Sequence, residues 1–223
     1  MCNKVMPARM AENLEWEPNR MTPTETNKSN EPRVATELDL RTIGATSTRA
    51  FVGDPVWEWL APRARSWKRG MPFVFRMVAA EHLGHQTVWV TPDVTAVAVW
   101  APPGHRTNQL RETLNAPRLA MVFGTKSLAG LRFYAAIRQA HPTEPHWYLA
   151  LLATDPAHQG KGHGSVVLQP TLDRCDDNGL PAYLESSKES NVAYYRRHGF
   201  ELQRELRPIA SGPAVWLMWR EPR

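Results

Sequence analysis

The most informative segment of this 223-residue chain is Gln159-Gly160-Lys161-Gly162-His163-Gly164. A short apolar run, residues 147–154, precedes it and ends at the breaker pair Asp155-Pro156. Apolar side chains then recur at helical spacing until Asn178-Gly179 stops the pattern. In a strand–turn–helix segment of this kind, the unpaired backbone N–H groups of the turn and the positive N-terminal end of the helix face the same site. Such an arrangement binds phosphate groups.

Spacing separates three phosphate-binding interpretations of this turn. The Walker pattern fails, because it needs glycine where Asp155 stands and Ser or Thr where Gly162 stands. A dinucleotide-binding turn gains support from Glu185, which lies near the position of the ribose-binding acid. However, the glycines follow G-x-G-x-G rather than G-x-G-x-x-G, and too little chain follows to complete a parallel sheet. The third interpretation is Gln-x-x-Gly-x-Gly, with Gln159, Gly162 and Gly164 at the key positions.

The segments after the turn fit the third interpretation. Residues 180–185, Leu-Pro-Ala-Tyr-Leu-Glu, predict a buried strand, and residues 191–200 predict a short helix followed by Gly-Phe. Together, Gln-x-x-Gly-x-Gly, the Leu-Glu strand and Asn-x-x-x-Tyr-x-x-x-Gly-Phe resemble the GNAT superfamily of acyl-CoA N-acyltransferases. The resemblance implies an α/β (α+β) fold, in which a mixed, mostly antiparallel sheet splays at its central parallel strands and is flanked by helices.

The resemblance also implies a cofactor site for acetyl-CoA, the acyl donor, with no metal. The backbone of Leu152, Ala153 and Thr154 would position the thioester, and Asn191 would either bond the pantetheine arm or cap its own helix. The phosphate-binding residues would be Gln159, Gly160, Lys161, Gly162, His163, Gly164 and Ser165.

Two residues are predicted to be catalytic. Tyr195 lies four residues before Gly199, where the family carries a tyrosine toward the thioester sulfur, so it is the candidate general acid; the alternative is a tyrosine that fills the core. Glu185 ends a strand on the acceptor side and is the candidate base, although a carboxylate there can be purely structural. His146 and His158 are weaker candidates for the base.

Residues 141–200 resemble one subgroup in particular, puromycin N-acetyltransferase and its relatives. The shared features include His141-Pro142, Asp-Pro-Ala-His-Gln-Gly-Lys-Gly through the turn, and Gln169-Pro170 within the helix. A proline inside a helix costs about 3 kcal/mol, so Pro170 marks a subgroup. The resemblance weakens toward residues 54–60. Four tryptophans, Trp57, Trp59, Trp100 and Trp147, either line an aromatic acceptor pocket or belong to the core.

Composition predicts one domain, residues 33–223, after a disordered polar tail, residues 1–32, in which Met10 and Met21 are alternative starts. The net charge of +5 without an aromatic-interleaved basic run predicts no nucleic-acid partner. No apolar run of about eighteen residues, the length of a membrane span, and no secretory leader pattern appear, so we expect a cytoplasmic protein without a membrane partner. Cys2 and Cys175 cannot form a disulfide framework, and Cys175 is expected in the core. Family members often form homodimers, so a homodimer is expected but not required.

The remaining elements follow from local patterns. We expect a strand near Arg33, and helices over 38–50, around 57–60 and over 71–83. Residues 86–91 and 95–100 predict a β-hairpin, and 108–140 predict two helices that break near Gly124 or Gly130.

The predicted function is transfer of an acetyl group from acetyl-CoA to a primary amine of a small molecule, antibiotic-like or aromatic, by direct attack on the thioester. Two alternatives stay open: a non-catalytic sensor of acyl-CoA, and an acetyltransferase that acts on protein amines.

Overall fold

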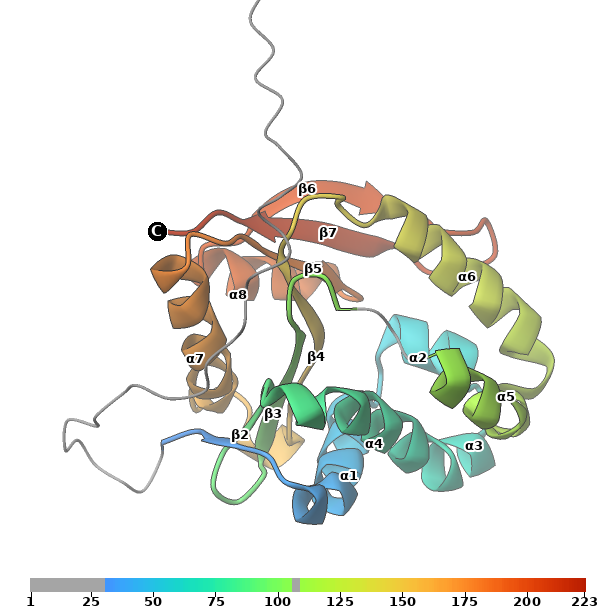
Figure 1. Ribbon diagram of the computed structural model, residues 1–223. Coiled ribbons are helices and arrows are strands. Elements are labelled where there is room, and N and C mark those ends of the chain that lie inside the picture. Colours follow the sequence, from blue (N-terminus) through green and yellow to red (C-terminus); the bar gives the residue numbers. More distant parts are fainter. Residues whose placement is uncertain (1–30, 106–108) are drawn as a thin grey trace, which may run out of the picture.

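The computed structural model describes residues 31–105 and 109–223 (Figure 1). The predicted disordered tail lies outside the described residues apart from its last two positions. No helix within the described ranges has the length and apolar character that a membrane span requires.

The described strands form one mixed sheet with the order β1-β2-β3-β4-β5-β7-β6. Every neighbouring pair is antiparallel except β4 and β5, which run parallel. The strands are β1 (Arg33–Val34), β2 (Val88–Val90), β3 (Ala96–Ala101), β4 (Trp147–Thr154), β5 (Ala182–Ser186), β6 (Glu201–Leu206) and β7 (Val215–Arg220). The predicted mixed sheet with one central parallel pair is thus confirmed.

Helices cover both faces of this sheet (Figure 1). They are α1 (Leu40–Ala50), α2 (Pro55–Leu60), α3 (Ala64–Arg69), α4 (Met71–His82), α5 (Gln109–Phe123), α6 (Ser127–Ala140), α7 (His163–Asp177) and α8 (Val192–Arg197). The hairpin prediction is confirmed by β2 and β3, and the predicted helix break falls at Gly124, where a 3-10 turn separates α5 from α6. Sequence analysis did not predict α3, β6 or β7.

Three apolar clusters hold the layers together. One lies between the sheet and helices α7 and α8, and includes Trp100, Trp147 and Cys175. A second lies between the sheet and helices α1 and α4, where Phe75 is fully buried. The third joins β5 and β7 to α2 and α6 through Phe133 and Tyr183. The expectation that Cys175 is a core residue is confirmed, because its side chain is fully buried.

β4 and β5 are paired only at their beginning. The register joins Trp147 to Ala182 and Tyr148 to Tyr183, and no pair follows, although β4 continues to Thr154 and β5 to Ser186. On its other edge, β4 carries a bulge: Val99 faces Leu151 and Trp100 faces Leu149, which leaves Ala150 as an extra residue. A bulge bends a strand and increases its twist. We call the space between the diverging strands the β4–β5 opening.

A buried ion pair fixes the C-terminal strand to α7. The guanidinium of Arg220 is 3% exposed and makes two hydrogen bonds, of 2.8 and 2.7 Å, to the carboxylate of Asp176. Its Nε donates to the carbonyl of His198 at 3.0 Å, which also ties the end of α8 to the sheet. This bidentate geometry is the strong form of the arginine–carboxylate interaction.

We predict that Asp176→Ala lowers the free energy of unfolding by about 3 kcal/mol, because it leaves a buried guanidinium without its counter-charge. Urea denaturation at pH 7 measures the change. The control is Asp177→Ala, whose exposed side chain should cost less than about 0.5 kcal/mol. Since Arg220 lowers the pKa of Asp176 below its ordinary 3.8, the difference should shrink as the pH falls below 4. Equal decreases in the free energy of unfolding for both variants would contradict a stabilising role of the Arg220–Asp176 ion pair.

Candidate active site

The predicted glycine turn connects the end of β4 to the start of α7. Gly160 and Gly162 have φ angles of +74° and +84°, in the left-handed region that favours glycine, and open space surrounds both Cα atoms. The first helical bond of α7 runs from Val166 N to Gly162 O at 3.1 Å. The N–H groups of residues 163–165 therefore precede the helical ladder and point out of the helix end.

Side chains of the turn hold its shape from within. Gln159 donates through Nε2 to the carbonyl of Thr154 at 3.1 Å, and Lys161 donates through Nζ to the carbonyl of Ala157 at 2.8 Å. The ring of His163 lies 2.9 Å from Thr95 Oγ1, and Ser165 Oγ lies 3.0 Å from His198 Nε2. All four residues were predicted to bind the cofactor, Lys161 through its charge and residues 160–165 through backbone N–H groups. Their side chains bond to other groups of the protein.

Gly164 allows a close approach between α7 and α8. A Cβ at this position would lie 2.9 Å from the hydroxyl oxygen of Tyr194 and 3.3 Å from Thr154 Oγ1. Any larger residue would therefore push α8 away from the first turn of α7.

The wall of the opening on the β4 side is the stretch Leu152-Ala153-Thr154. These residues pair with Ala98, Val97 and Ala96 of β3 on one edge only. Their other edge faces away from β3 and is not paired by β5. The carbonyl of Thr154 already accepts from Gln159, whereas β5 pairs with none of these three residues. Their predicted role toward the thioester stays a prediction.

Tyr195 lies on α8, beside the opening, and is 8% exposed. It packs in the cluster beneath α7 and α8, so both interpretations of this residue, core and acid, fit its position. Burial raises the pKa of Tyr195 above its ordinary value, and the neighbouring Tyr194 and Asp54 add to the shift. The phenol consequently stays protonated at neutral pH, the state a proton donor requires.

Asn191 begins α8, but its side chain makes no capping hydrogen bond. The capping alternative for this residue is therefore wrong in this structure, and the predicted role toward a ligand stays a prediction.

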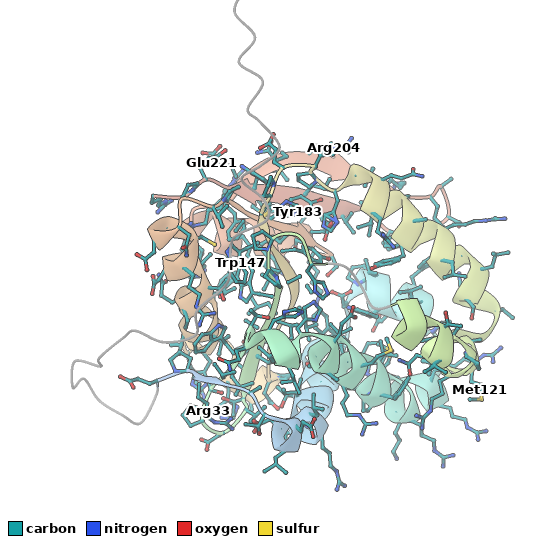
Figure 2. All side chains as sticks on the ribbon, in the orientation of Figure 1. Arg33, Met121, Trp147, Tyr183, Arg204 and Glu221 are labelled. Atoms are coloured by element: carbon teal, nitrogen blue, oxygen red, sulfur yellow. The ribbon has the colours of Figure 1, made fainter. Side chains whose placement is uncertain are left out.

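Glu185 lies on the β5 side of the opening, on the face that α2 and α6 cover. Its side chain is 7% exposed. The imidazole Nε2 of His141 lies 3.4 Å from Glu185 Oε1, and the ring of His141 packs edge-on against Tyr148 and Tyr183, with centroid separations of 4.6 and 4.8 Å. Tyr183 lies in the interior of the molecule (Figure 2). We call Glu185, His141, Tyr148 and Tyr183 the carboxyl cluster.

Burial sets the ionisation of this cluster. It raises the pKa of Glu185 to about 7, although the hydroxyl groups of Tyr148 and Tyr183 favour the charged form. Burial also lowers the pKa of His141 to about 4, with the positive charges of His146 and Arg138 acting in the same direction. Near neutral pH the cluster therefore combines a carboxyl group that titrates there with a neutral imidazole.

Sequence analysis missed three polar residues near the opening. Asp54 is 2% exposed; its Oδ1 caps α2 by accepting from Val56 N and Trp57 N, and its Oδ2 accepts a short hydrogen bond from Ser187 Oγ. His141 is the third. An Asp-Pro pair before an apolar helix is a capping signal that could have found Asp54. His141 was noted only as part of the subgroup resemblance, without a role, and no local pattern marks Ser187.

The four tryptophans lie mainly in the core. Trp100 and Trp147 are 0% and 5% exposed beneath α7, and Trp57 packs against Phe75. Trp59 contacts Phe133 of α6 and belongs to the cluster on the Glu185 side. The phenol groups that act on Glu185 are instead those of Tyr148 and Tyr183.

A separate cavity of about 570 Å³ lies beside β6 and β7, away from the glycine turn. Tyr183 and the residues on either side of His141, Ala140 and Pro142, form part of its wall. In the described part of the chain, no group of three or more His, Cys, Asp or Glu side chains could hold a metal ion.

Comparison with known proteins agrees with this geometry. Residues 100–200 match the Acetyltransferase (GNAT) family. An uncharacterized N-acetyltransferase from Schizosaccharomyces pombe is 26% identical over 198 residues, which cover 82% of this chain and 80% of that protein.

Solved structures share the fold. A histone acetyltransferase HPA2 and related acetyltransferase from Corynebacterium glutamicum superposes with a TM-score of 0.65 and 24% identity, covering 87% of this chain and 97% of that chain. The polyamine N acetyltransferase of Drosophila melanogaster superposes with a TM-score of 0.58 and 14% identity, covering 86% and 99%. Residues 100–200 thus match the GNAT family of acetyltransferases, and the described chain has the fold of the solved acetyltransferase structures.

We predict that Glu185→Gln stabilises the protein in a pH-dependent way. The pKa of Glu185 rises from an ordinary 4.5 to about 7 on folding, so the wild type loses stability as the pH rises between these values. The neutral amide does not titrate, so the free energy of unfolding of the variant minus that of the wild type should grow from pH 4.5 to 7 and then level off. Denaturant titrations across this range measure the difference. A difference independent of pH would show that Glu185 is not buried as described.

Proposed function

We propose that the protein transfers an acetyl group from acetyl-CoA to a primary amine of a small molecule by direct attack of the amine on the thioester. The observation that carries this proposal is the β4–β5 opening: it has a glycine turn at one end, a buried tyrosine on one side and a buried carboxyl group on the other.

The donor would lie along the opening. Backbone N–H groups of residues 160–165 and the positive end of α7 would bind the pyrophosphate, with Lys161 adding charge. The unpaired edge of Leu152, Ala153 and Thr154 would bond the pantetheine arm and polarise the thioester carbonyl, with Asn191 at the opposite side. These side chains and backbone groups suit an anionic, extended donor without a metal.

The chemistry needs a neutral amine, stabilisation of the oxyanion and a proton for the departing thiolate. Glu185, with a pKa of about 7, would accept the proton of the amine directly or through one water. Tyr195 would supply the proton to the thiolate, because its raised pKa keeps it protonated. The acid and the base would thus act from opposite walls of the opening.

The surroundings of Glu185 favour a small acceptor. Its carboxyl group is enclosed by tyrosines of β4 and β5, while α6 and α2 pack over the same face through Phe133 and Trp59. A compact amine with an apolar or aromatic body fits these surfaces better than a folded protein does. The likeness to puromycin N-acetyltransferase, the homodimer and the cytoplasmic location stay predictions.

Thiol release from acetyl-CoA tests the proposal across separate amine classes: puromycin, aminoglycosides, polyamines, arylamines and lysine peptides. Release with a small amine supports it, and release with lysine peptides alone would favour acetylation of protein amines. No thiol release with any amine of the panel, while acetyl-CoA still raises the melting temperature, would favour a non-catalytic sensor of acyl-CoA. Silence without a thermal shift would remove acetyl-CoA as the ligand.

Tyr195→Phe should lower kcat about a hundredfold to a thousandfold, within the range of general-acid contributions, and leave acetyl-CoA affinity nearly unchanged. Steady-state kinetics and calorimetry measure the two quantities. Tyr194→Phe is the matched control: its hydroxyl packs against Gly164, where the proposed chemistry needs no proton donor, and the variant should retain most of kcat. An unchanged rate in Tyr195→Phe would exclude this residue from the mechanism.

Gly162→Val should abolish acetyl-CoA binding, because a branched side chain at φ +84° distorts the turn and blocks close approach to its N–H groups. Gly179→Val is the control at the other end of α7, with φ +61° and equally open surroundings. It should lower stability similarly but keep the affinity that calorimetry measures. Wild-type affinity in Gly162→Val would place the phosphates elsewhere.

A further inference from the structure

His141 stands in a position that the proposed chemistry has not yet used. It follows the last residue of α6, and its Nε2 atom lies 3.4 Å from Oε1 of Glu185. Both atoms are buried, and neither has a hydrogen-bond partner among the described residues, so the 3.4 Å approach brings together two unsatisfied polar atoms. A buried polar atom without a partner is costly, so the two atoms are each other's natural partners.

We propose that His141 is a positioning residue for acetyl transfer: as a neutral imidazole it directs its Nε2–H toward Oε1 of Glu185, holds the carboxylate in place and favours its ionised form. The inference rests on the proposed function, because it assigns a partner to the base of that reaction.

The surroundings fix the protonation state of the imidazole. Burial, with the charges of His146 and Arg138, keeps His141 neutral at physiological pH. A neutral imidazole carries one N–H, and a carboxylate can only accept, so the tautomer with hydrogen on Nε2 is selected. Edge-on contacts with the rings of Tyr148 and Tyr183 hold the imidazole plane.

The other groups around the carboxyl cluster do not replace this donor. Tyr148 of β4 and Tyr183 of β5 also favour ionised Glu185, and Tyr134 of α6 lies within electrostatic range of Tyr148. Two cations also lie near the cluster: Arg138 of α6 acts on His141, and Arg204 of β6 acts on Tyr183. Neither arginine is among the groups that act on Glu185, and the tyrosines carry no positive charge. The carboxylate therefore depends on neutral donors, and loss of one donor raises its pKa.

The second histidine of this region provides a matched control. The ring of His146 lies 5.7 Å from that of His141 and 5.5 Å from that of Tyr183, and its Nδ1 lies 2.6 Å from the carbonyl of Glu144. It shares the loop and one aromatic neighbour, Tyr183, with His141, but no interaction joins it to Glu185 in the described structure.

The test compares His141→Phe, which keeps a ring without a donor, with His141→Gln, whose amide can donate from nearly the same point, and with His146→Gln. The first measurement is the pKa of Glu185. It is determined by ¹³C NMR of the carboxyl carbon in glutamate-labelled protein, without any substrate. We expect it to rise by about one unit in His141→Phe and to stay within about 0.3 units of wild type in the other two.

The second measurement is the pH profile of kcat/KM with an amine found in the panel. The acidic limb should move up by the same amount in His141→Phe, giving an approximately fivefold loss of kcat/KM at pH 7 that recovers at pH 9. The KM for acetyl-CoA should be unchanged. A merely structural role would lower the rate equally at every pH.

The same Glu185 pKa in wild type and in His141→Phe would overturn the proposal. A rise of that pKa in His141→Gln as large as the rise in His141→Phe would overturn it as well. A wild type that transfers no acetyl group would contradict the proposed function but leave the NMR comparison intact, so the two failures are distinguishable.

Discussion

The parting of β4 from β5 is the constraint on which the rest of the molecule depends. Two strands that pair at Tyr148 and Tyr183 and then diverge leave backbone groups along both inner edges that no strand satisfies. The bulge at Ala150 bends β4 away while its outer edge stays paired with β3. The bidentate bond between Arg220 and Asp176 ties the β5–β7 half of the sheet to α7, which follows β4 in the chain. The opening is therefore held from both sides rather than being a flexible gap.

The two sides of the opening have opposite electrostatic character. At the end of β4, left-handed glycines and the start of α7 direct N–H groups outward, which favours negative charge. At the β5 side, Glu185 is enclosed by phenols and a neutral imidazole, which favour a group able to give up a proton. An anionic donor and an amine acceptor are thus suited to different walls, and the thioester would lie between them.

Much of the β4–α8 region was predictable from sequence because its signals are local. The apolar run 147–154, the glycine turn and the Tyr-x-x-x-Gly-Phe ending each specify one element, and the structure contains them in the predicted order. Strand β6 gave no such signal: Glu201–Leu206 is a polar edge strand with five exposed residues in a row. His141 and Ser187 could not be identified for a different reason. Their importance comes from contacts with Glu185 and Asp54 that only tertiary structure creates.

The helical pair α5 and α6 is inserted between two neighbouring strands, β3 and β4, which a short turn would be enough to connect. The segment that would bind the donor is nearly contiguous, from β4 to α8, whereas the face that carries Glu185 is assembled from α2, α6 and β7 as well. Side chains such as Met121 and Leu131 lie at the outer surface of the insert (Figure 2). Mutations in the insert can therefore accumulate without disturbing the strand–turn–helix unit. In evolutionary terms, substitutions in the insert can change which amine such a protein accepts. The strand–turn–helix unit that would bind the acyl donor is then selected separately.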